Sequence, residues 1–372
     1  MSFAGLVRMT PTLTKDTAQG LNGGSATVVP RPRNNQMDAI KGGAILLVIL
    51  GHAIQSHVSV FDDNLLFRII YSFHMPLFMI LSGWFAAPEK YWKLKSTAVR
   101  LVLPVFSWYL ILYVVEGQCK TMSFVELVRR WVVSPDVGLW FLWVLFLCHL
   151  WLVLARQLEA RIGVSAYLVG AVVLCAIPFS SFGLTLAKYY FPFFALGYLT
   201  ARYWKDLARY LHVAFAASIL VFPLAFHFWH RTSAGLLPLQ IILAGHPVDA
   251  ANPLRLAARL VCAVSGSVMF AYLLAILAAL RPVGALLAWL GVQTLEIYVI
   301  HQPLIHYAIG QGGIAVVTSM IATTAASLGA IWVLRKSEWA SLLLFGRIPR
   351  GWGRRAPQQS PDSAVAPMSQ TE

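Results

Sequence analysis

The chain has 372 residues, of which 58% are hydrophobic and only 12% are charged, and its formal net charge is +14. Soluble domains carry about 25% charged residues, so this composition excludes a soluble domain and indicates a polytopic membrane protein. The basic residues lie at the ends of apolar runs and form no groove interleaved with aromatic residues, so we expect no nucleic-acid partner. The four cysteines lie far apart and form no CxxC pair, which indicates neither a disulfide framework nor a zinc site.

The order of polar and apolar runs predicts three regions. Residues 1–36 are polar and lack the apolar core of a secretory signal, so we expect a disordered cytoplasmic tail. Residues 37–336 are expected to form an all-α, polytopic bundle of about ten transmembrane helices with both termini cytoplasmic. Residues 337–372 are basic and then polar, and we expect a cytoplasmic tail that contacts membrane lipids. The expected spans lie near residues 41–57, 65–86, 97–115, 139–155, 164–182, 186–203, 211–229, 257–280, 284–309 and 314–334.

Clusters of lysine and arginine set the expected orientation, because cytoplasmic loops carry the excess of these residues. The basic residues between 90 and 95 and those after residue 334 are therefore placed inside, and Asp62 outside. The basic residues of the loop 116–137 oppose this orientation. Residues 235–245 supply roughly ten apolar residues, too few to cross a core of about 30 Å, so a re-entrant or surface segment is expected there.

The first expected span carries a lysine and a histidine on one face. From Lys41 to His52 the helix rises roughly 16 Å and turns to within about 20° of its starting direction. A cation is thus expected at the inner mouth of this helix and an imidazole near the middle of the bilayer. Gln55 and Ser56 extend the same polar face outward.

The second expected span contains the run FHMPLF, with His74 inside an apolar segment. Ionisable side chains that face lipid are costly, so histidines at this depth normally face the bundle interior and mark a site. A histidine bonded to a neighbouring carbonyl is the plain structural alternative for either residue alone. Imidazole suits proton exchange, because its ordinary pKa lies near 6.5.

A third polar pattern lies in the ninth expected span, in the run GVQTLEIYVIH from Gly291 to His301. Glu296 lies about twelve residues into this span, roughly 18 Å deep, where a carboxylate needs a partner or a role. His301 is expected near the outer end, where a hydrogen-bonding role at the interface competes with a contact to substrate. His227 and His230 are three residues apart, but no third ligand lies nearby, so we expect no metal site.

Together these motifs resemble the membrane acyltransferase family 3. The features shared with that family are a basic residue separated by ten residues from a histidine, here Lys41 and His52, then the FHMPLF run and the GVQTLEIYVIH run. Lys41 stands where much of the family has arginine, and in this respect the chain is most similar to the exopolysaccharide and fucose O-acetyltransferases. The basic run before a proline, RLVLP from Arg100, is similar to a further family pattern.

The resemblance implies transfer of an acetyl group from cytoplasmic acetyl-CoA to a sugar hydroxyl of an exopolysaccharide or other cell-envelope glycan precursor, at the cell inner membrane. His52 and His74 are the expected catalytic residues, and either could deprotonate the hydroxyl or carry the acyl group. Lys41 and Arg100 are expected to bind the donor. Glu296 is expected to orient or bind the acceptor, and His301 to bind it.

The main alternative is a proton-coupled transporter of a small solute or glycan, in which the buried histidines and Glu296 relay protons. No clear pair of interrupted repeats supports it. A non-catalytic component of polysaccharide export or assembly is a third possibility.

Overall fold

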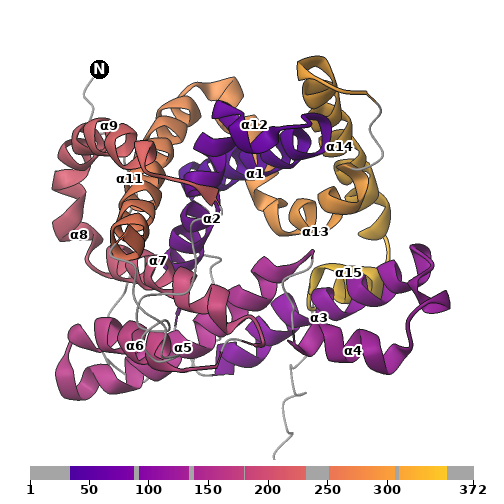
Figure 1. Cartoon of the computed structure of the whole chain (residues 1–372), viewed down its shortest axis with the longest axis horizontal. Coiled ribbons are helices and arrows are strands. Elements are labelled where there is room, and N and C mark those ends of the chain that lie inside the picture. Colours follow the sequence, from indigo (N-terminus) through magenta and orange to yellow (C-terminus); the bar gives the residue numbers. More distant parts are fainter. Residues whose placement is uncertain are drawn as a thin grey trace, which may run out of the picture.

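The computed structural model describes residues 34–87, 92–133, 138–179, 181–231, 251–305 and 310–349, and these ranges are helical and contain no strand (Figure 1). The α-helices are α1 Asn35–His57, α2 Leu65–Trp84, α3 Trp92–Val115, α4 Phe124–Val133, α5 Trp140–Ile162, α6 Ser165–Ala176, α7 Leu184–Arg202, α8 Trp204–Leu207, α9 Leu211–His227, α11 Ala251–Ala279, α12 Arg281–Val292, α13 Thr294–Ile305, α14 Gly313–Leu334 and α15 Glu338–Phe345. Three short 3₁₀ turns are η2 Phe61–Asp63, η3 Gln118–Lys120 and η4 Ala208–Tyr210. The expected all-α membrane fold is confirmed.

Seven helices in the described ranges are long and apolar enough to cross a membrane, and the bent pair α12 and α13 makes up to eight. Helix α6 has 12 residues, fewer than a straight crossing needs, although a span was predicted over 164–182. The count of about ten spans and the cytoplasmic termini stay predictions. Residues 235–245, 1–33 and 350–372 lie outside the described residues.

The prediction of one continuous span over residues 284–309 was wrong. Helix α12 ends at Val292, helix α13 begins at Thr294, and their axes differ by 79°. The backbone N–H of Gln293 donates to the carbonyl of Leu290, which closes a turn at the break. Hydropathy is continuous through this turn, so the apolar pattern alone does not reveal the break.

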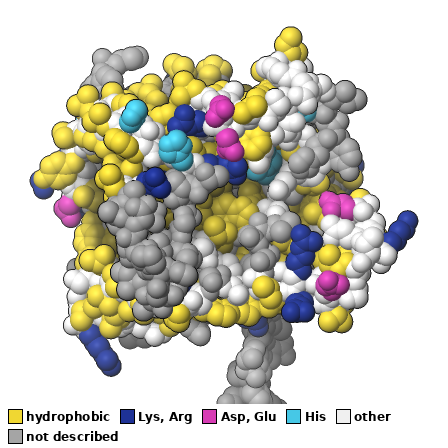
Figure 2. Space-filling model, viewed as in Figure 1, with side chains coloured by type: hydrophobic (Ala, Val, Ile, Leu, Met, Phe, Trp, Pro, Cys, Tyr) yellow, Lys and Arg dark blue, Asp and Glu magenta, His cyan; other side chains and the backbone are white. Residues whose placement is uncertain are grey.

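Helices α1 and α2, which carry His52 and His74, have the largest buried share among the seven described helices that are long enough to span a membrane. About two thirds of the span residues are buried in α1 (67%) and α2 (61%), against 11% in the span over 204–227 that contains α9. Helix α1 packs against α2, α11, α12, α13 and α14. The face seen in Figure 2 is hollowed near its centre, where the visible side chains are largely hydrophobic. His57 of α1 and Ser72 and His74 of α2 are buried, whereas Lys41 and His52 are only partly buried.

Close helix approaches at glycine fix the position of α2. A methyl group on Gly83 would lie 1.9 Å from the carbonyl oxygen of Phe194 in α7, and one on Gly197 would lie 2.0 Å from that of Ile80. These distances are far shorter than any tolerated contact, so α2 and α7 touch backbone to backbone. Small residues allow such contacts between membrane helices.

We expect Gly83→Ala to destabilise the protein by about 1–3 kcal/mol, because the added methyl group must push α2 away from α7. Gly329→Ala on α14 is the matched control, since no atom lies within 4 Å of its added methyl group. Thermal unfolding in detergent should show a melting temperature several degrees lower for Gly83→Ala only. Equal melting temperatures would contradict the close approach.

An exposed ion pair joins the loop after α1 to the end of α9. Arg231 donates from Nε and Nη2 to the two oxygens of Asp62, at 2.6 and 2.8 Å, and this pair lowers the pKa of Asp62. Because the pKa is lowered on folding, the pair stabilises the fold above the ordinary pKa of aspartate and is lost as the pH falls through the lowered value. Both side chains are exposed, so the contribution is small.

Candidate active site

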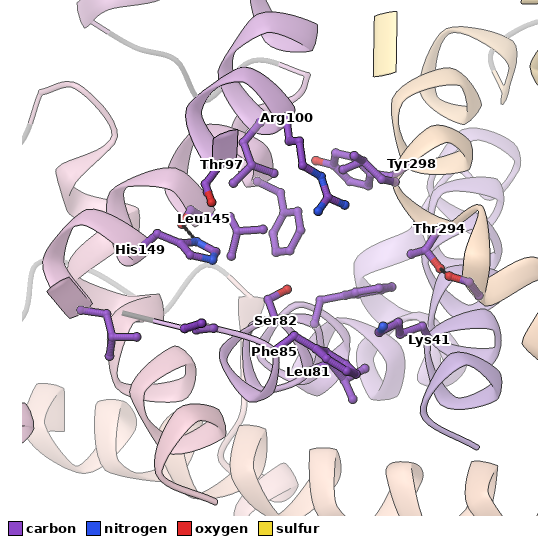
Figure 3. Close-up of a pocket in the computed structure, with 18 of the residues that line it drawn as sticks. Lys41, Leu81, Ser82, Phe85, Thr97, Arg100, Leu145, His149, Thr294 and Tyr298 are labelled. Atoms are coloured by element: carbon purple, nitrogen blue, oxygen red, sulfur yellow. Dashed lines mark hydrogen bonds between the residues drawn. The ribbon is translucent and has the colours of Figure 1, made fainter. Parts of the chain in front are cut away.

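A cavity of about 630 Å³ opens between α1, α2, α3, α5 and α13. Its lining is mixed, with apolar walls and a few polar groups, as is usual in small-molecule sites. Figure 3 shows Lys41 and Arg100 pointing into this cavity from opposite walls. The polar residues of the lining are Asp38, Lys41, Ser82, Ser96, Thr97, Arg100, His149, Thr294 and Tyr298.

Lys41 is held at the edge of the cavity by two neighbours. Its Nζ lies 3.3 Å from Oδ1 of Asp38, one turn earlier on α1, and 3.8 Å from the ring centroid of Phe85. The lysine side chain remains 24% exposed. Its ammonium group can therefore reach a ligand while one carboxylate balances its charge.

Three histidines from three helices are linked through Tyr71 and His52. The ring centroids of His52 and His301 are 5.4 Å apart, and those of Tyr71 and His74 are 4.7 Å apart. The Tyr71 hydroxyl donates to Oε1 of Gln55 at 2.9 Å and lies 3.4 Å from Nδ1 of His52. We call His52, His74, His301 and Tyr71 the histidine cluster.

Backbone carbonyls fix two of these imidazoles. Nδ1 of His74 is 2.8 Å from the carbonyl oxygen of Ile70, and Nδ1 of His301 is 2.7 Å from that of Tyr298. A carbonyl can only accept, so each Nδ1 carries the proton and, in the neutral ring, each Nε2 is an acceptor. Nε2 of His301 is buried and has no hydrogen-bond partner among the described residues. A neutral imidazole with an available Nε2 is suited to accept a proton.

The histidine cluster lies next to residues that line the cavity, although none of its own four residues does. Met75 and Tyr298 line the cavity. Met75 directly follows His74 in α2, and the Tyr298 ring lies 5.6 Å from that of His301. Ile45 lines the cavity two turns before His52, a rise of about 10 Å. A donor that enters beside Lys41 and Arg100 could thus extend its reactive end toward the histidines.

The structure brings five of the six predicted site residues to this region and leaves one apart. Lys41 and Arg100 share the cavity, and His52, His74 and His301 share the cluster. His301 was predicted near the outer end of its span, and that depth stays a prediction, whereas the residue is 1% exposed and its ring lies 5.4 Å from that of His52.

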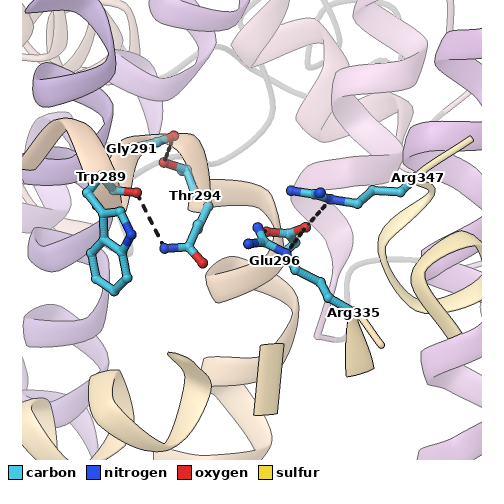
Figure 4. Close-up of polar contacts among 7 residues, drawn as sticks. Trp289, Gly291, Thr294, Glu296, Arg335 and Arg347 are labelled. Atoms are coloured by element: carbon cyan, nitrogen blue, oxygen red, sulfur yellow. Dashed lines mark hydrogen bonds and ion pairs between the residues drawn. The ribbon is translucent and has the colours of Figure 1, made fainter. Parts of the chain in front are cut away.

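Glu296 belongs neither to the lining of the cavity nor to the histidine cluster. It stands in the first turn of α13 and forms ion pairs with Arg335, at the end of α14, and with Arg347, after α15 (Figure 4). The predicted depth of roughly 18 Å counted residues along one continuous helix, which the break before α13 interrupts, so the depth of Glu296 stays a prediction. Its carboxylate is 4% exposed and faces arginines instead of the histidine cluster.

Two residues of the site were not predicted from the sequence. His149 of α5 lines the cavity, and its Nδ1 is 2.9 Å from the carbonyl oxygen of Leu145. The signal that identified His52, a histidine inside an apolar span, applies equally to His149. Tyr71 has no such signal, because a tyrosine at helical spacing is typical of any membrane helix.

The described ranges contain no group of three His, Cys, Asp or Glu side chains arranged to hold a metal ion. The polar groups that converge here are imidazoles, a phenol, a lysine and an arginine. Such a set can bind an anionic donor at one end and move a proton at the other.

This architecture, a polytopic helical bundle with buried histidines behind a cavity with cationic walls, is suited to a membrane enzyme that moves a group from an anionic donor. A family model described as an acyltransferase domain matches residues 34–336. The chain therefore belongs to the membrane acyltransferase family 3, and the family predicted from its motifs is confirmed.

Two nodulation proteins named NolL share part of this sequence. The protein from Sinorhizobium fredii is 28% identical over 203 residues, which is 50% of this chain and 54% of the relative. The protein from Mesorhizobium japonicum is 28% identical over 193 residues, 48% of this chain and 51% of the relative. The chain thus spans about half the length of these curated relatives. No solved structure matches.

Proposed function

We propose that this protein is an integral membrane O-acetyltransferase that moves acetyl from cytoplasmic acetyl-CoA to a sugar hydroxyl of an exopolysaccharide or other cell-envelope glycan precursor, in the inner membrane. The observation that carries the proposal is the cavity with Lys41 and Arg100 on its walls and the histidine cluster behind it. Membership of the acyltransferase family supports the reaction class. The similarity to nodulation proteins is compatible with an envelope or secreted glycan as acceptor.

The donor end of the proposal concerns Lys41 and Arg100. Coenzyme A carries phosphate groups, which lysine binds as a point charge and arginine through paired N–H donors. The cavity of about 630 Å³ lies within the range of ligand pockets, about 300–1,000 Å³. Its apolar walls suit the uncharged arm of the donor, whose thioester would point toward the cluster.

The chemical step needs one proton acceptor near the sugar hydroxyl. In this proposal His52 accepts the hydroxyl proton, the hydroxyl oxygen attacks the thioester carbonyl carbon, a C–O bond forms and the C–S bond breaks. The coenzyme A thiolate leaves and takes up a proton. His74 is the second proposed catalytic residue, as base or as transient acyl carrier. His301, beside His52, is proposed to bind the acceptor.

Two opposite faces serve the two substrates in this proposal. Both termini and the inner ends of α1 and α3 are proposed to be cytoplasmic, with Asp62 outside. We expect a cysteine introduced at Asp62 to react with a membrane-impermeant maleimide in intact cells, because η2 is exposed. A cysteine introduced at Lys336 should react only after the cells are opened. The reverse pattern of labelling would overturn the orientation.

Analysis of envelope glycans tests the reaction. Deletion of the gene should remove ester-linked acetyl groups from one glycan, and the purified protein should restore them from acetyl-CoA. A proton-coupled transporter would instead show loss of solute uptake with no acylated product. Absence of any acyl product from purified, folded protein would overturn the proposed function.

A further inference from the structure

Glu296 links three segments that are far apart in the chain. Nη2 of Arg335 pairs with one carboxylate oxygen, and Nε of Arg347 pairs with the other. Nε of Arg335 also lies 3.3 Å from the oxygen that Arg347 contacts. These bonds connect the start of α13 to the end of α14 and to the segment that follows α15, as Figure 4 shows. We call this group the Glu296 clamp.

The segment after α15 lies directly on Arg100. Gly346 has a φ of +62°, and a methyl group there would lie 2.5 Å from Cα and 2.6 Å from the carbonyl oxygen of Arg100. One residue before, Phe345 is 1% exposed. The indole Nε1 of Trp108 donates to the carbonyl of Leu344 at 3.1 Å. The end of α15 is therefore fixed against α3 at the residue that was predicted to bind the donor.

The same clamp also fixes a second wall of the cavity, the one formed by α13. Glu296 stands between Thr294 and Tyr298 on α13, and both of these line the cavity. Arg347 directly follows Gly346, so one residue pair contacts α3 and α13 at once. The clamp thus sets the distance between the wall that carries Arg100 and the wall that carries Tyr298.

The state of the carboxylate argues against a direct contact with substrate. It is buried, and both of its oxygens are used by guanidinium groups that are 29% and 47% exposed. A buried carboxylate held by two arginines is fully paired, and separation of the pairs would leave uncompensated charge. A ligand would have to displace one of the arginines to reach it.

We propose that Glu296 and Arg347 are positioning residues for the donor site, and that the end of α15 is a structural part of that site. The clamp holds Arg100 at the spacing from Lys41 and Tyr298 that the donor needs. This inference rests on the proposed function. It assigns Glu296 to orientation through the C-terminal segment rather than to contact with the acceptor.

Kinetics with acetyl-CoA as the varied substrate test the inference. Glu296→Gln and Arg347→Met should each raise the KM for acetyl-CoA roughly tenfold, with kcat within about threefold of wild type, because Arg100 would lose its set spacing from Lys41 and a charged hydrogen bond to the donor is worth at least this much. Because both changes break one clamp, the double variant should resemble the single variants. Arg347→Lys, which keeps the charge, should recover part of the affinity.

Two matched controls separate the clamp from general loss of packing. Glu159 is a second buried carboxylate with two arginine partners, Arg156 at 2.7 Å and Arg202 at 2.5 Å, and it does not line the cavity. Glu159→Gln should leave the KM for acetyl-CoA unchanged. Gly346→Ala should raise it, whereas Gly117→Ala, at a similar φ of +69° with open space around it, should not.

Three other results are informative, and the first two would overturn the inference. Unchanged donor KM in Glu296→Gln and Arg347→Met would remove the clamp from the donor site. A raised glycan KM in Glu296→Gln alone would return Glu296 to the acceptor. If Glu296→Gln does not accumulate, Arg347→Met and Gly346→Ala decide the question. An inactive wild-type protein overturns the proposed function itself, whereas an active wild type with unchanged variants overturns this inference alone.

Discussion

Replacement of His52 by alanine is expected to lower acyl transfer at least about a hundredfold, the smaller effect typical of a lost acid or base. The protein should still insert and fold, because His52 is only partly buried and its contact with the Tyr71 hydroxyl is long, at 3.4 Å. A single-turnover assay with purified variant, matched for amount and melting temperature, measures the loss.

His74→Ala is expected to show a loss of similar size. Its Nδ1 bond to the carbonyl of Ile70 keeps Nε2 as an acceptor, and its ring contacts Tyr71. If His52 is the base and His74 the acyl carrier, a His74 variant should show no labelled acyl-enzyme, whereas a His52 variant should still accumulate it. The opposite pattern would exchange the two roles.

His57→Gln provides the control for this pair. His57 lies on the same helix and is 3% exposed, and its Nδ1 is 2.9 Å from the carbonyl of Gly310. His57 is thus a second histidine of α1. It is buried, its ring is bonded to the backbone, and it lies outside the histidine cluster. Activity that survives in His57→Gln but is lost in His52→Ala would tie the chemistry to the cluster. Near wild-type activity in both His52→Ala and His74→Ala would show that neither residue is catalytic.

Site residues that lie on one helix face, or in one sequence motif, could be predicted from the sequence. Lys41 and His52 could be placed together because helical geometry fixes their relative direction over three turns. His74 could be placed in the adjacent helix by depth. These are local relations, and hydropathy with helix periodicity is enough to find them.

The relations that the sequence did not reveal are those made between distant segments. The contact between His52 and His301 depends on the break between α12 and α13, which continuous hydropathy hides. One partner of Glu296, Arg335, lies 39 residues further along the chain. The other partner, Arg347, lies in the segment 337–372 that was predicted to be a tail. Such contacts follow from how helices pack, and a single sequence carries no periodic signal for them.

Lys41 gives a test that separates binding of the donor from topology. If its role is a positive charge beside a phosphate or thioester, Lys41→Arg should keep much of the activity. Arginine can also pair with Asp38 and stack on Phe85, the two contacts that Lys41 makes. Lys41→Gln should lose most of the activity, chiefly through a KM for acetyl-CoA raised by roughly tenfold or more, since a charged hydrogen bond contributes about 1.5–3 kcal/mol.

Asp38→Asn is the matched control, because it removes the same ion pair from the other side. Within a helix such a pair contributes only about 0.2–0.5 kcal/mol, so loss of the pair alone cannot explain a large rise in KM. Asp38→Asn leaves the ammonium group without its nearest carboxylate and should hold or lower the KM for acetyl-CoA. A KM that rises equally in Asp38→Asn and Lys41→Gln would assign both residues to packing of the inner end of α1.

Two other outcomes define what Lys41 does. If the ammonium makes a point contact in a tight pocket, the planar guanidinium will not fit, and Lys41→Arg will fail together with Lys41→Gln. If Lys41 only obeys the positive-inside bias, both variants will remain active. Wild-type KM for acetyl-CoA in Lys41→Gln would therefore remove this residue from the donor site and leave Arg100 as the cation that faces the cavity from the opposite wall.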